Sequence, residues 1–281
     1  MAELTDRIYW DKVHENKEFL KYDPGESIGS SNILKRIYKI LFYNYSSYSD
    51  FLLWEKIYKK FMPQTSGLKI LEVGSAPGLF LVELSKKFNF DPYGVEFSRK
   101  GSVLNKEIFI QNNLNADNVI FADFFSKEFQ NVYKEKFDII ISRGFIEHFT
   151  NIQKVIINHR NILKKGGLMF IIIPNFKGFN YKLLKFFNKE SISKHNLDIM
   201  NKEKFRKIFK NLGIRECYIN YCGTFFIGLF YTHRNSVKKL ILNLCKKLQY
   251  FFDLIFLLIF KKRGLETRFF SPFLIFIGIK K

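Results

Sequence analysis

The 281-residue chain carries 46 Lys and Arg against 26 Asp and Glu, a formal net charge of +20, and 47% of its residues are hydrophobic. This composition excludes a disordered chain and a low-complexity fibre, because it provides enough apolar side chains for a sizeable core. The three cysteines, Cys217, Cys222 and Cys245, form no CxxC pair, which argues against a disulfide scaffold, a structural zinc site and a thioredoxin-like motif. We expect reduced thiols and no bound metal.

The net positive charge comes entirely from the second half of the chain. Residues 1–150 contain 20 basic and 20 acidic side chains, whereas residues 151–281 contain 26 basic and 6 acidic ones. A basic half attracts anionic partners such as phospholipid headgroups, a phosphorylated substrate or nucleic acid.

Residues 1–62 predict an N-terminal helical cap or flap. The opening segment has mixed charge and lacks the apolar stretch of a secretory signal, which predicts a cytoplasmic protein. Apolar positions at helical spacing predict one helix over 33–41, capped by Ser31 and Asn32, and another over 50–61.

Residues 63–223 alternate short apolar runs with helical stretches, the pattern of a parallel sheet covered on both faces. A turn is expected at 164–167, before the fifth strand. The expected strands are 68–73, 92–97, 119–123, 137–142, 167–174 and 214–222, and the clearest helices are 79–88 and 202–212.

Residues 224–268 predict a basic and apolar helical insertion, followed by a last core strand within 269–281. In the stretch 236–263, pairs of lysines alternate with wide apolar runs. The most apolar part, 248–260, is too short to cross a bilayer, because 13 helical residues reach only about 20 Å. An anionic membrane surface suits this composition, with lysines on the headgroups. A lid or a dimer helix is the alternative.

The turn after the first strand and the acid after the second predict a nucleoside site. Ligands of open α/β sheets bind beyond the carboxyl ends of the strands. The turn reads GSAPG (74–78), and the second strand ends at Glu96, a residue type that accepts hydrogen bonds from ribose hydroxyls. The G-x-G-x-x-G pattern of nicotinamide-binding loops fails at Leu79, and Glu72 would repel a pyrophosphate. The loop therefore favours S-adenosylmethionine over NAD.

Five segments in order resemble the motifs of the class I S-adenosylmethionine-dependent methyltransferases of the small-molecule type, similar to types 11, 12 and 25. ILEVGSAPG resembles motif I, with Ala76 in place of the middle glycine, and LKKGGLMFIIIPN resembles the fifth-strand motif, with Lys165 in place of a proline. The other three are YGVEFS, ADFF and FDIIISRGFIEHF. The resemblance covers about residues 68–175. It implies an α/β fold with a Rossmann-like, seven-stranded, mostly parallel sheet, an antiparallel last strand and helices on both faces.

The resemblance also implies roles for individual residues toward the cofactor, S-adenosylmethionine. Its methionine part would face the backbone of the turn, its ribose would bind Glu96, and its adenine would lie by Phe97 and Asp123. Arg143 and Gly144 would lie close to it after the fourth strand. The complete set of expected cofactor residues is Glu72, Gly74, Ser75, Ala76, Gly78, Glu96, Phe97, Asp123, Phe124, Arg143 and Gly144.

Two histidines are candidates for the acceptor side of the site. His148 belongs to an E-H pair that resembles one near the methyl-transfer pocket of many small-molecule methyltransferases. As a neutral imidazole it is a candidate general base, and the alternative is that it only hydrogen-bonds the backbone or the cofactor. His195 lies where such enzymes build their substrate pocket and is a candidate base or substrate ligand, although a surface loop position is the interpretation that we favour. Tyr9 and Trp10 are candidates for a flap over the cofactor.

The expected reaction is in-line methylation of a small-molecule, glycan or lipid-linked acceptor at oxygen, near the inner face of the membrane. The sequence SRGF after the fourth strand differs from the motif of adenine-N-methyltransferases, and no cysteine precedes residue 217, as a cytosine-C5 enzyme would require. Three alternatives remain: an RNA methyltransferase attracted through the basic half, a nucleotide-binding oxidoreductase, and a non-catalytic nucleotide-binding relative. Nucleic acid is the less favoured partner.

Overall fold

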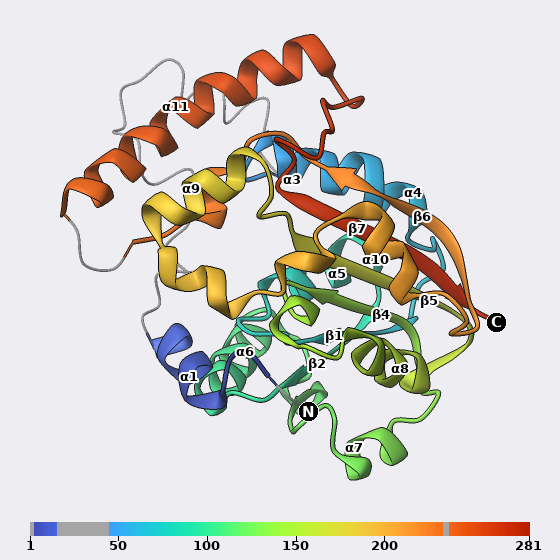
Figure 1. The fold of residues 1–281 in the computed structure, drawn as a ribbon. Helices are drawn as coiled ribbons and strands as arrows, with labels where there is room; N and C mark the ends of the chain where they lie inside the picture. The colour runs from blue at the N-terminus through green and yellow to red at the C-terminus, as the bar shows by residue number, and fades with distance from the viewer. Residues whose placement is uncertain (1–2, 16–44, 233–235) are drawn as a thin grey trace.

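The structure is a computed structural model in which residues 3–15, 45–232 and 236–281 are described. Its centre is a seven-stranded sheet of order β3-β2-β1-β4-β5-β7-β6 (Figure 1). The strands are β1 Lys69–Val73, β2 Asp91–Glu96, β3 Val119–Phe121, β4 Phe137–Arg143, β5 Leu163–Pro174, β6 Ile214–Cys222 and β7 Phe273–Lys280.

The sheet is parallel from β3 to β5, and β7 lies antiparallel between β5 and β6. This arrangement confirms the predicted α/β class, with its Rossmann-like, mostly parallel seven-stranded sheet and antiparallel last strand. The order reverses at β1, with β2 on one side and β4 on the other. The reversal creates the crevice at the carboxyl ends of these strands where a ligand is expected.

Successive residues of each strand contribute to the core on opposite faces of the sheet, as the two-residue repeat of a strand requires. Ile70 packs with η1, α5 and α6 on one face, whereas Leu71 packs with α7, α8 and α10 on the other. Both side chains are fully buried.

The helical elements are α1 Arg7–Glu15, α3 Tyr48–Leu52, η1 Leu53–Tyr58, α4 Lys59–Phe61, α5 Leu79–Phe88, α6 Arg99–Gln111, η2 Ala116–Asn118, α7 Lys127–Val132, η3 Ile146–His148, α8 Ile152–Ile162, α9 Phe179–Phe187, η4 Lys189–Lys194, η5 Leu197–Ile199, α10 Lys202–Ile208, η6 Ile227–Leu229 and α11 Ser236–Phe260.

The described part of 1–62 lies in two places. Helix α1 packs on α6, whereas the continuous helical run from α3 through η1 to α4 is buried against the sheet through Trp54 and Ile57. This run corresponds to the predicted helix 50–61, with a π-helical middle that the apolar spacing did not indicate. The predicted helix 33–41 lies outside the described residues, and the proposed domain boundaries stay a prediction.

The turn expected at 164–167 is instead part of β5, and this prediction was wrong. Strand β5 begins at Leu163, opposite Phe137, and the next pair joins Leu168 to Ile139, so that extra residues bulge from β5. Gly166 adopts a positive φ of 77° in this bulge. The glycines suggested a chain reversal, but pairing with β4 continues on both sides of the bulge.

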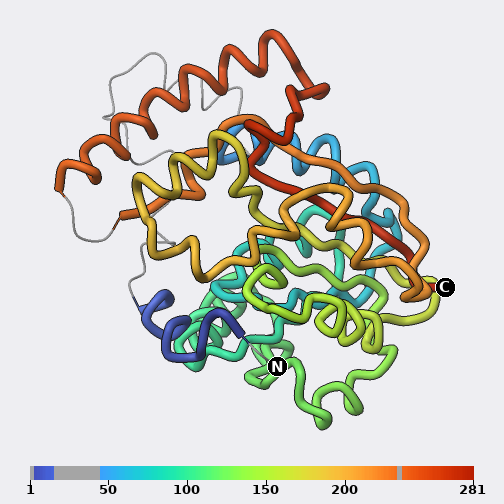
Figure 2. Tube along the Cα trace, viewed as in Figure 1, coloured from blue at the N-terminus to red at the C-terminus, as the bar shows by residue number. Residues whose placement is uncertain are grey.

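The predicted insertion 236–263 contains one long helix, α11, which connects β6 to β7 and crosses the outside of the molecule above α9 and α3 (Figures 1 and 2). Its inner face buries Leu242, Gln249, Asp253 and Leu254. The Gln249 side chain accepts a hydrogen bond of 2.7 Å from the backbone N–H of Ile227 in η6. Among the described residues, no helix is long and apolar enough to cross a membrane.

Candidate cofactor and acceptor site

A cleft of about 830 Å³, counting its open mouth, lies beyond the carboxyl ends of β1, β2 and β4. Its size suits a small organic ligand. It contains eight of the eleven residues expected to contact a cofactor, which are Gly74, Ala76, Glu96, Phe97, Asp123, Phe124, Arg143 and Gly144. Glu72, Ser75 and Gly78 are adjacent but do not line it.

The turn after β1 brings the backbone close to the cleft because its glycines adopt conformations that other residues avoid. Gly74 and Gly78 have φ values of 72° and 97°. A Cβ atom at Gly74 would lie 2.9 Å from the Phe145 ring, and one at Gly78 would lie 2.0 Å from Asn105 Oδ1. Ser75 accepts a 2.6 Å hydrogen bond from the Asn105 side chain, which holds the turn against α6.

Glu96 presents a buried carboxylate at the end of β2. Its oxygens accept hydrogen bonds from the backbone N–H groups of Ala76 (3.2 Å) and Ser98 (2.8 Å). Burial raises the pKa of Glu96, while these backbone donors lower it, and the net result is a raised pKa. The carboxylate is therefore rigidly positioned and retains lone pairs for a ligand hydroxyl.

Glu72 lies behind the cleft and is paired with Arg143. The Arg143 Nε atom donates to Glu72 Oε1 at 3.2 Å, and the guanidinium lies 3.5 Å from the centre of the Phe80 ring. Burial raises the pKa of Glu72 to about 7, with Arg143 acting in the opposite direction. In this arrangement, Arg143 connects Glu72 to the wall of the cleft.

The ends of β3 and β4 complete the expected cofactor wall. Asp123 Oδ1 accepts a 2.8 Å hydrogen bond from the backbone N–H of Phe125. Phe124 is buried, whereas Phe97 is 39% exposed and lies beneath the guanidinium of Arg7, 5.6 Å from its ring centre. Asp123 and Phe97 thus provide an acceptor and an aromatic surface on the same wall.

Helix α1 covers the cleft from the N-terminal side. Trp10 lines the cleft and meets the His148 ring edge-on at 5.0 Å. The backbone N–H of Leu4 donates to the His148 carbonyl at 2.8 Å, which attaches the segment before α1 to η3. Ser98 donates to Asp11 at 2.6 Å, which attaches α1 to the start of α6.

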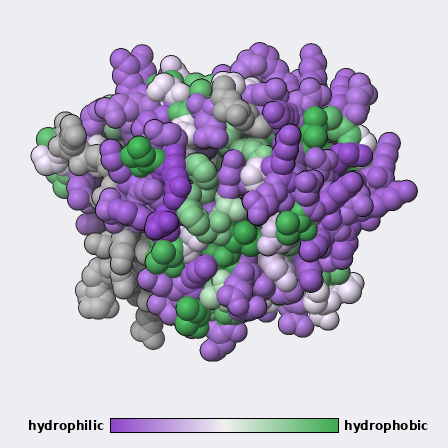
Figure 3. Space-filling model, turned by 90° about the horizontal axis from the view of Figure 1, so that it is seen from below, coloured by the Kyte–Doolittle hydropathy of each residue, from purple (hydrophilic) through white to green (hydrophobic). Residues whose placement is uncertain are grey.

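On the face seen in Figure 3, hydrophilic side chains predominate and surround a central hydrophobic area.

His148 and His195 lie together, although 46 residues separate them in the chain. Their ring centres are 4.6 Å apart. His148 is buried and lines the cleft, and desolvation and the nearby His195 lower its pKa to about 3. Glu147 is fully buried, and burial raises its pKa to about 8. His195 lies in the loop between η4 and η5 and is partly exposed, but its ring packs on His148 and, at 5.0 Å, on Phe176.

Sequence reasoning missed part of the cleft wall. His14 received no role, yet it lines the cleft beside Trp10, and Glu3 and Thr5 also line it. These residues belong to a segment far in sequence from the recognised motifs. The aromatic pair Tyr9-Trp10, considered as part of a flap over the cofactor, was the sequence signal that could have drawn attention to this segment.

Comparison with known proteins agrees with this geometry. A family model described as a methyltransferase domain matches residues 48–215. The chain belongs to the class I S-adenosylmethionine-dependent methyltransferases. A ubiquinone biosynthesis O-methyltransferase of Pelagibacter ubique is 29% identical over 126 residues, which are 43% of this methyltransferase and 50% of the relative. This methyltransferase thus spans half the length of that curated relative.

Solved structures share the fold at low sequence identity. One is phosphoethanolamine N-methyltransferase 2 of Haemonchus contortus, solved with phosphomonomethylethanolamine and S-adenosylhomocysteine. It is 17% identical to this methyltransferase, with a TM-score of 0.57, and the match covers 100% of this methyltransferase and 60% of the Haemonchus contortus chain. Geranyl diphosphate C-methyltransferase of Streptomyces coelicolor is 9% identical with a TM-score of 0.50, covering 83% of this methyltransferase and 78% of its own chain.

S-adenosylmethionine is the cofactor of this family, and the residues of the cleft fit it. The buried Glu96 carboxylate can accept hydrogen bonds from a ribose diol, and the turn that carries Gly74 and Ala76 brings the backbone to the wall of the cleft. The Glu72–Arg143 pair leaves no uncompensated charge behind the turn.

Proposed function

We propose that this methyltransferase transfers a methyl group to an oxygen atom of a small-molecule, glycan or lipid-linked acceptor. The observation that supports this proposal is a histidine on the wall of the cofactor cleft with an available ring nitrogen. His148 Nδ1 lies 2.7 Å from the carbonyl oxygen of Lys194, so Nδ1 carries the proton and Nε2 keeps its lone pair. A hydroxyl group in the cleft would find an acceptor there.

The proposed residue roles are those that the family resemblance implies, and the position of eight of the eleven residues on the cleft wall supports them. Glu96 binds the ribose hydroxyls, Asp123 accepts from the adenine amino group, and Phe97 and Phe124 pack on the base. The turn 74–78 approaches the methionine part, while Glu72 and Arg143 act from behind it. When bound, the cofactor supplies a methyl group on a sulfonium, so the chain mainly has to hold the acceptor oxygen in line with it.

His148 alone is a weak base. A general base works best when its pKa lies near the working pH, and burial lowers the pKa of His148 to about 3. We therefore assign His148 the role of orienting the acceptor hydroxyl. The relative from Pelagibacter ubique, whose name specifies an O-methyltransferase, supports oxygen as the methylated atom.

A methyl-transfer screen tests the proposal. Purified protein is incubated with S-adenosylmethionine carrying a ¹³C methyl group and with lipid, glycan, small-molecule or RNA fractions, and products are identified by mass spectrometry and NMR. We expect a methoxy carbon in a non-RNA fraction, lost in Glu96→Ala and retained in Glu216→Gln. An N- or C-methyl product, or transfer to RNA alone, would contradict it.

We further propose that α11 docks the enzyme on an anionic membrane surface. Its exposed apolar residues recur every three or four positions, so they form one stripe opposite the buried face. Leu240 and Leu258 are 70% and 71% exposed. The other members of the stripe are Val237, Leu244, Leu248, Phe251, Phe252 and Ile259. The exposed lysines Lys239, Lys247 and Lys261 lie on the same helix or directly after it. Apolar side chains would enter the acyl boundary while lysines contact headgroups.

Vesicle co-sedimentation tests the docking proposal. Full-length protein is mixed with vesicles that contain phosphatidylglycerol or only phosphatidylcholine. We expect binding to the anionic vesicles that falls in Leu240→Gln/Leu258→Gln and is retained in Ile110→Gln, which alters a similarly exposed residue on α6, 63% exposed. Equal binding by all three proteins, or none by the wild type, would contradict the proposal.

A further inference from the structure

We propose that Glu147, His148 and His195 bind a divalent transition-metal ion at the acceptor end of the cleft. The inference deepens the proposed function and rests on it: the ion would take the Nε2 lone pair of His148, and the acceptor oxygen would then bind the ion instead of the imidazole. Sequence alone predicted no metal, since the two histidines are far apart in the chain and form no short ligand motif.

The three side chains converge on one point. One ligand atom from each residue lies within 4.8 Å of those of the other two, and His148 Nε2 is 3.9 Å from Glu147 Oε1. Ligands at typical zinc distances of about 2.1 Å are about 3.4 Å apart in a tetrahedral site. The longest separation in the set would therefore have to close by about 1.4 Å when an ion binds, which side-chain rotation can supply. Two imidazoles and one carboxylate suit Zn²⁺, Fe²⁺ or Co²⁺ better than Mg²⁺ or Ca²⁺.

Both histidines have the tautomer that a metal ligand requires. His148 Nδ1 lies 2.7 Å from the Lys194 carbonyl oxygen, and His195 Nδ1 lies 2.6 Å from the Ser191 carbonyl oxygen. A carbonyl oxygen only accepts hydrogen bonds, so each Nδ1 carries the proton and each Nε2 has a free lone pair. Such second hydrogen bonds orient metal-bound histidines in proteins. Such a bond by itself is ordinary, since His159 Nδ1 lies 2.8 Å from the Val155 carbonyl oxygen, and it is the convergence of the three side chains that indicates a shared ligand.

The Glu147 carboxylate provides independent support. The residue is 1% exposed, and neither oxygen accepts a hydrogen bond from any other described residue. A buried polar group without a partner is destabilising, and a buried charge more so. A cation between the carboxylate and the two imidazoles removes this cost.

The backbone holds the ligands together. The backbone N–H of Asn196 donates to the Glu147 carbonyl at 2.6 Å, and the Asn196 side chain donates to the Phe149 carbonyl at 3.3 Å. These bonds attach the loop that carries His195 to the segment that carries Glu147 and His148. The cluster is therefore built by the fold and does not depend on the placement of a free loop.

Three protein ligands leave a coordination position open, as in catalytic metal sites. His148 lines the cleft, so this position lies within reach of the acceptor. A bound hydroxyl loses its proton to solvent more readily. Its oxygen lone pair then forms the bond to the methyl carbon, while the carbon–sulfur bond breaks and leaves its electron pair on sulfur. Such activation would compensate for the weak basicity of His148.

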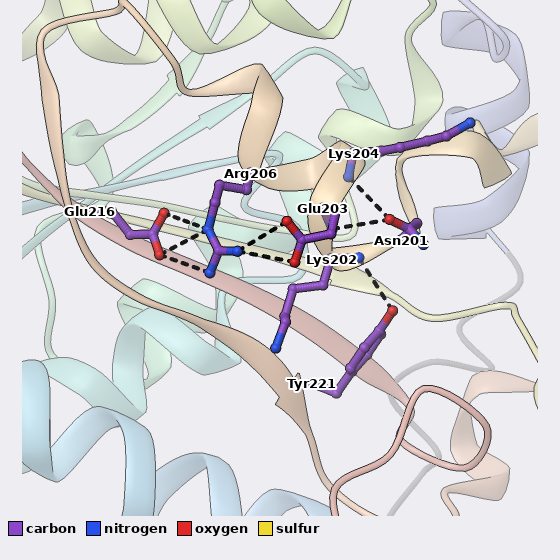
Figure 4. A network of polar contacts seen from close by, with 7 residues as sticks. All are labelled: Asn201, Lys202, Glu203, Lys204, Arg206, Glu216 and Tyr221. Carbon is purple, nitrogen blue, oxygen red and sulfur yellow. Dashed lines mark hydrogen bonds and ion pairs between the residues drawn. The ribbon is translucent and has the colours of Figure 1, made fainter.

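Metal binding is tested on the full chain without any acceptor. Protein treated with EDTA and then dialysed is titrated with Zn²⁺ by calorimetry and with Co²⁺ by visible absorption. We expect one ion per chain, and affinity at least tenfold weaker in Glu147→Gln and His195→Asn, since loss of even an outer-shell partner costs about 10- to 100-fold. Glu216→Gln is the matched control, because Glu216 pairs with Arg206 in a separate network between α10 and β6 (Figure 4). Absence of binding, or equal affinity in all variants, would overturn the proposal.

X-ray absorption of the zinc-loaded wild type keeps the test independent of variant folding. We expect a shell with two imidazole nitrogens, and sulfur ligands or oxygen alone would overturn the site. Methyl transfer separates this inference from the proposed function. Full transfer to oxygen by EDTA-treated protein would refute the role of the ion while the proposed function stands. Metal binding without an O-methyl product would refute the proposed function while the site stands.

Discussion

Substitution of Gly78 by alanine tests how the turn after β1 is built. At its φ of 97°, an L residue is strained by roughly 1–2 kcal/mol. The new Cβ would lie 2.0 Å from Asn105 Oδ1, so the Asn105 side chain has to move and its buried 2.6 Å bond to Ser75 is lost. Loss of such a bond costs about 1–3 kcal/mol. The expected total is a decrease of about 2–5 kcal/mol in the free energy of unfolding.

Gly67→Ala is the matched control. Gly67 also has a positive φ, 73°, but a Cβ there meets nothing within 4 Å. The entropy that alanine removes from the unfolded chain is the same in both variants, so it cancels in the comparison. Urea unfolding followed by circular dichroism gives both values, and calorimetry with S-adenosylhomocysteine should show weakened binding only in Gly78→Ala. Equal losses of stability in the two variants would refute the argument.

Three further outcomes are expected. Glu96→Gln should weaken binding of S-adenosylhomocysteine by roughly 10- to 100-fold, because hydrogen bonds to a charged group contribute about 1.5–3 kcal/mol; unchanged affinity in calorimetry would exclude Glu96 from the ribose site. Burial alone would raise the pKa of Glu55, but hydrogen bonds from Lys262 and other neighbours lower it to about 2. The ionised Glu55 carboxylate therefore stabilises the fold fully above pH 4.5, the ordinary pKa of a glutamate, and this stabilisation is lost as the pH falls toward 2. In thermal unfolding, the Tm difference between wild type and Glu55→Gln should shrink between pH 6 and pH 3. Trp10→Ala should raise the KM for the acceptor or the Kd for the cofactor with little change in Tm, since Trp10 covers His148 from a short helix at the edge of the fold; a large fall in Tm with unchanged binding would show a purely structural role.

The sheet could be predicted because its strands are continuous apolar runs and its helices carry one apolar face. The runs around Ile70 and Ile140 have no other stable place than the centre of a sheet. Motif order then located the cleft, because the strand ends that carry Glu96 and Asp123 meet at the reversal of strand order. The position of these two residues at the ends of parallel strands was sufficient to predict that they lie at the cleft.

The cluster around Glu147 could not be predicted in the same way. His195 reaches it through the packing of η4 and a hydrogen bond between the backbone of Asn196 and Glu147, and neither leaves a periodic trace in the sequence. The bulge in β5 was missed because Gly166 favours a turn as readily as an irregular strand. Local propensity does not distinguish these outcomes, since the choice depends on pairing with β4.

The position of β7 has a consequence for synthesis of the protein. Residues 273–280 lie between β5 and β6, so β6 cannot join the sheet until residue 280 has left the ribosome. Until then the apolar edge of β5 around Ile171 has no partner, and open strand edges promote association between chains. The nascent protein should therefore depend on chaperones until β7 has been made, and a truncation before residue 273 should aggregate.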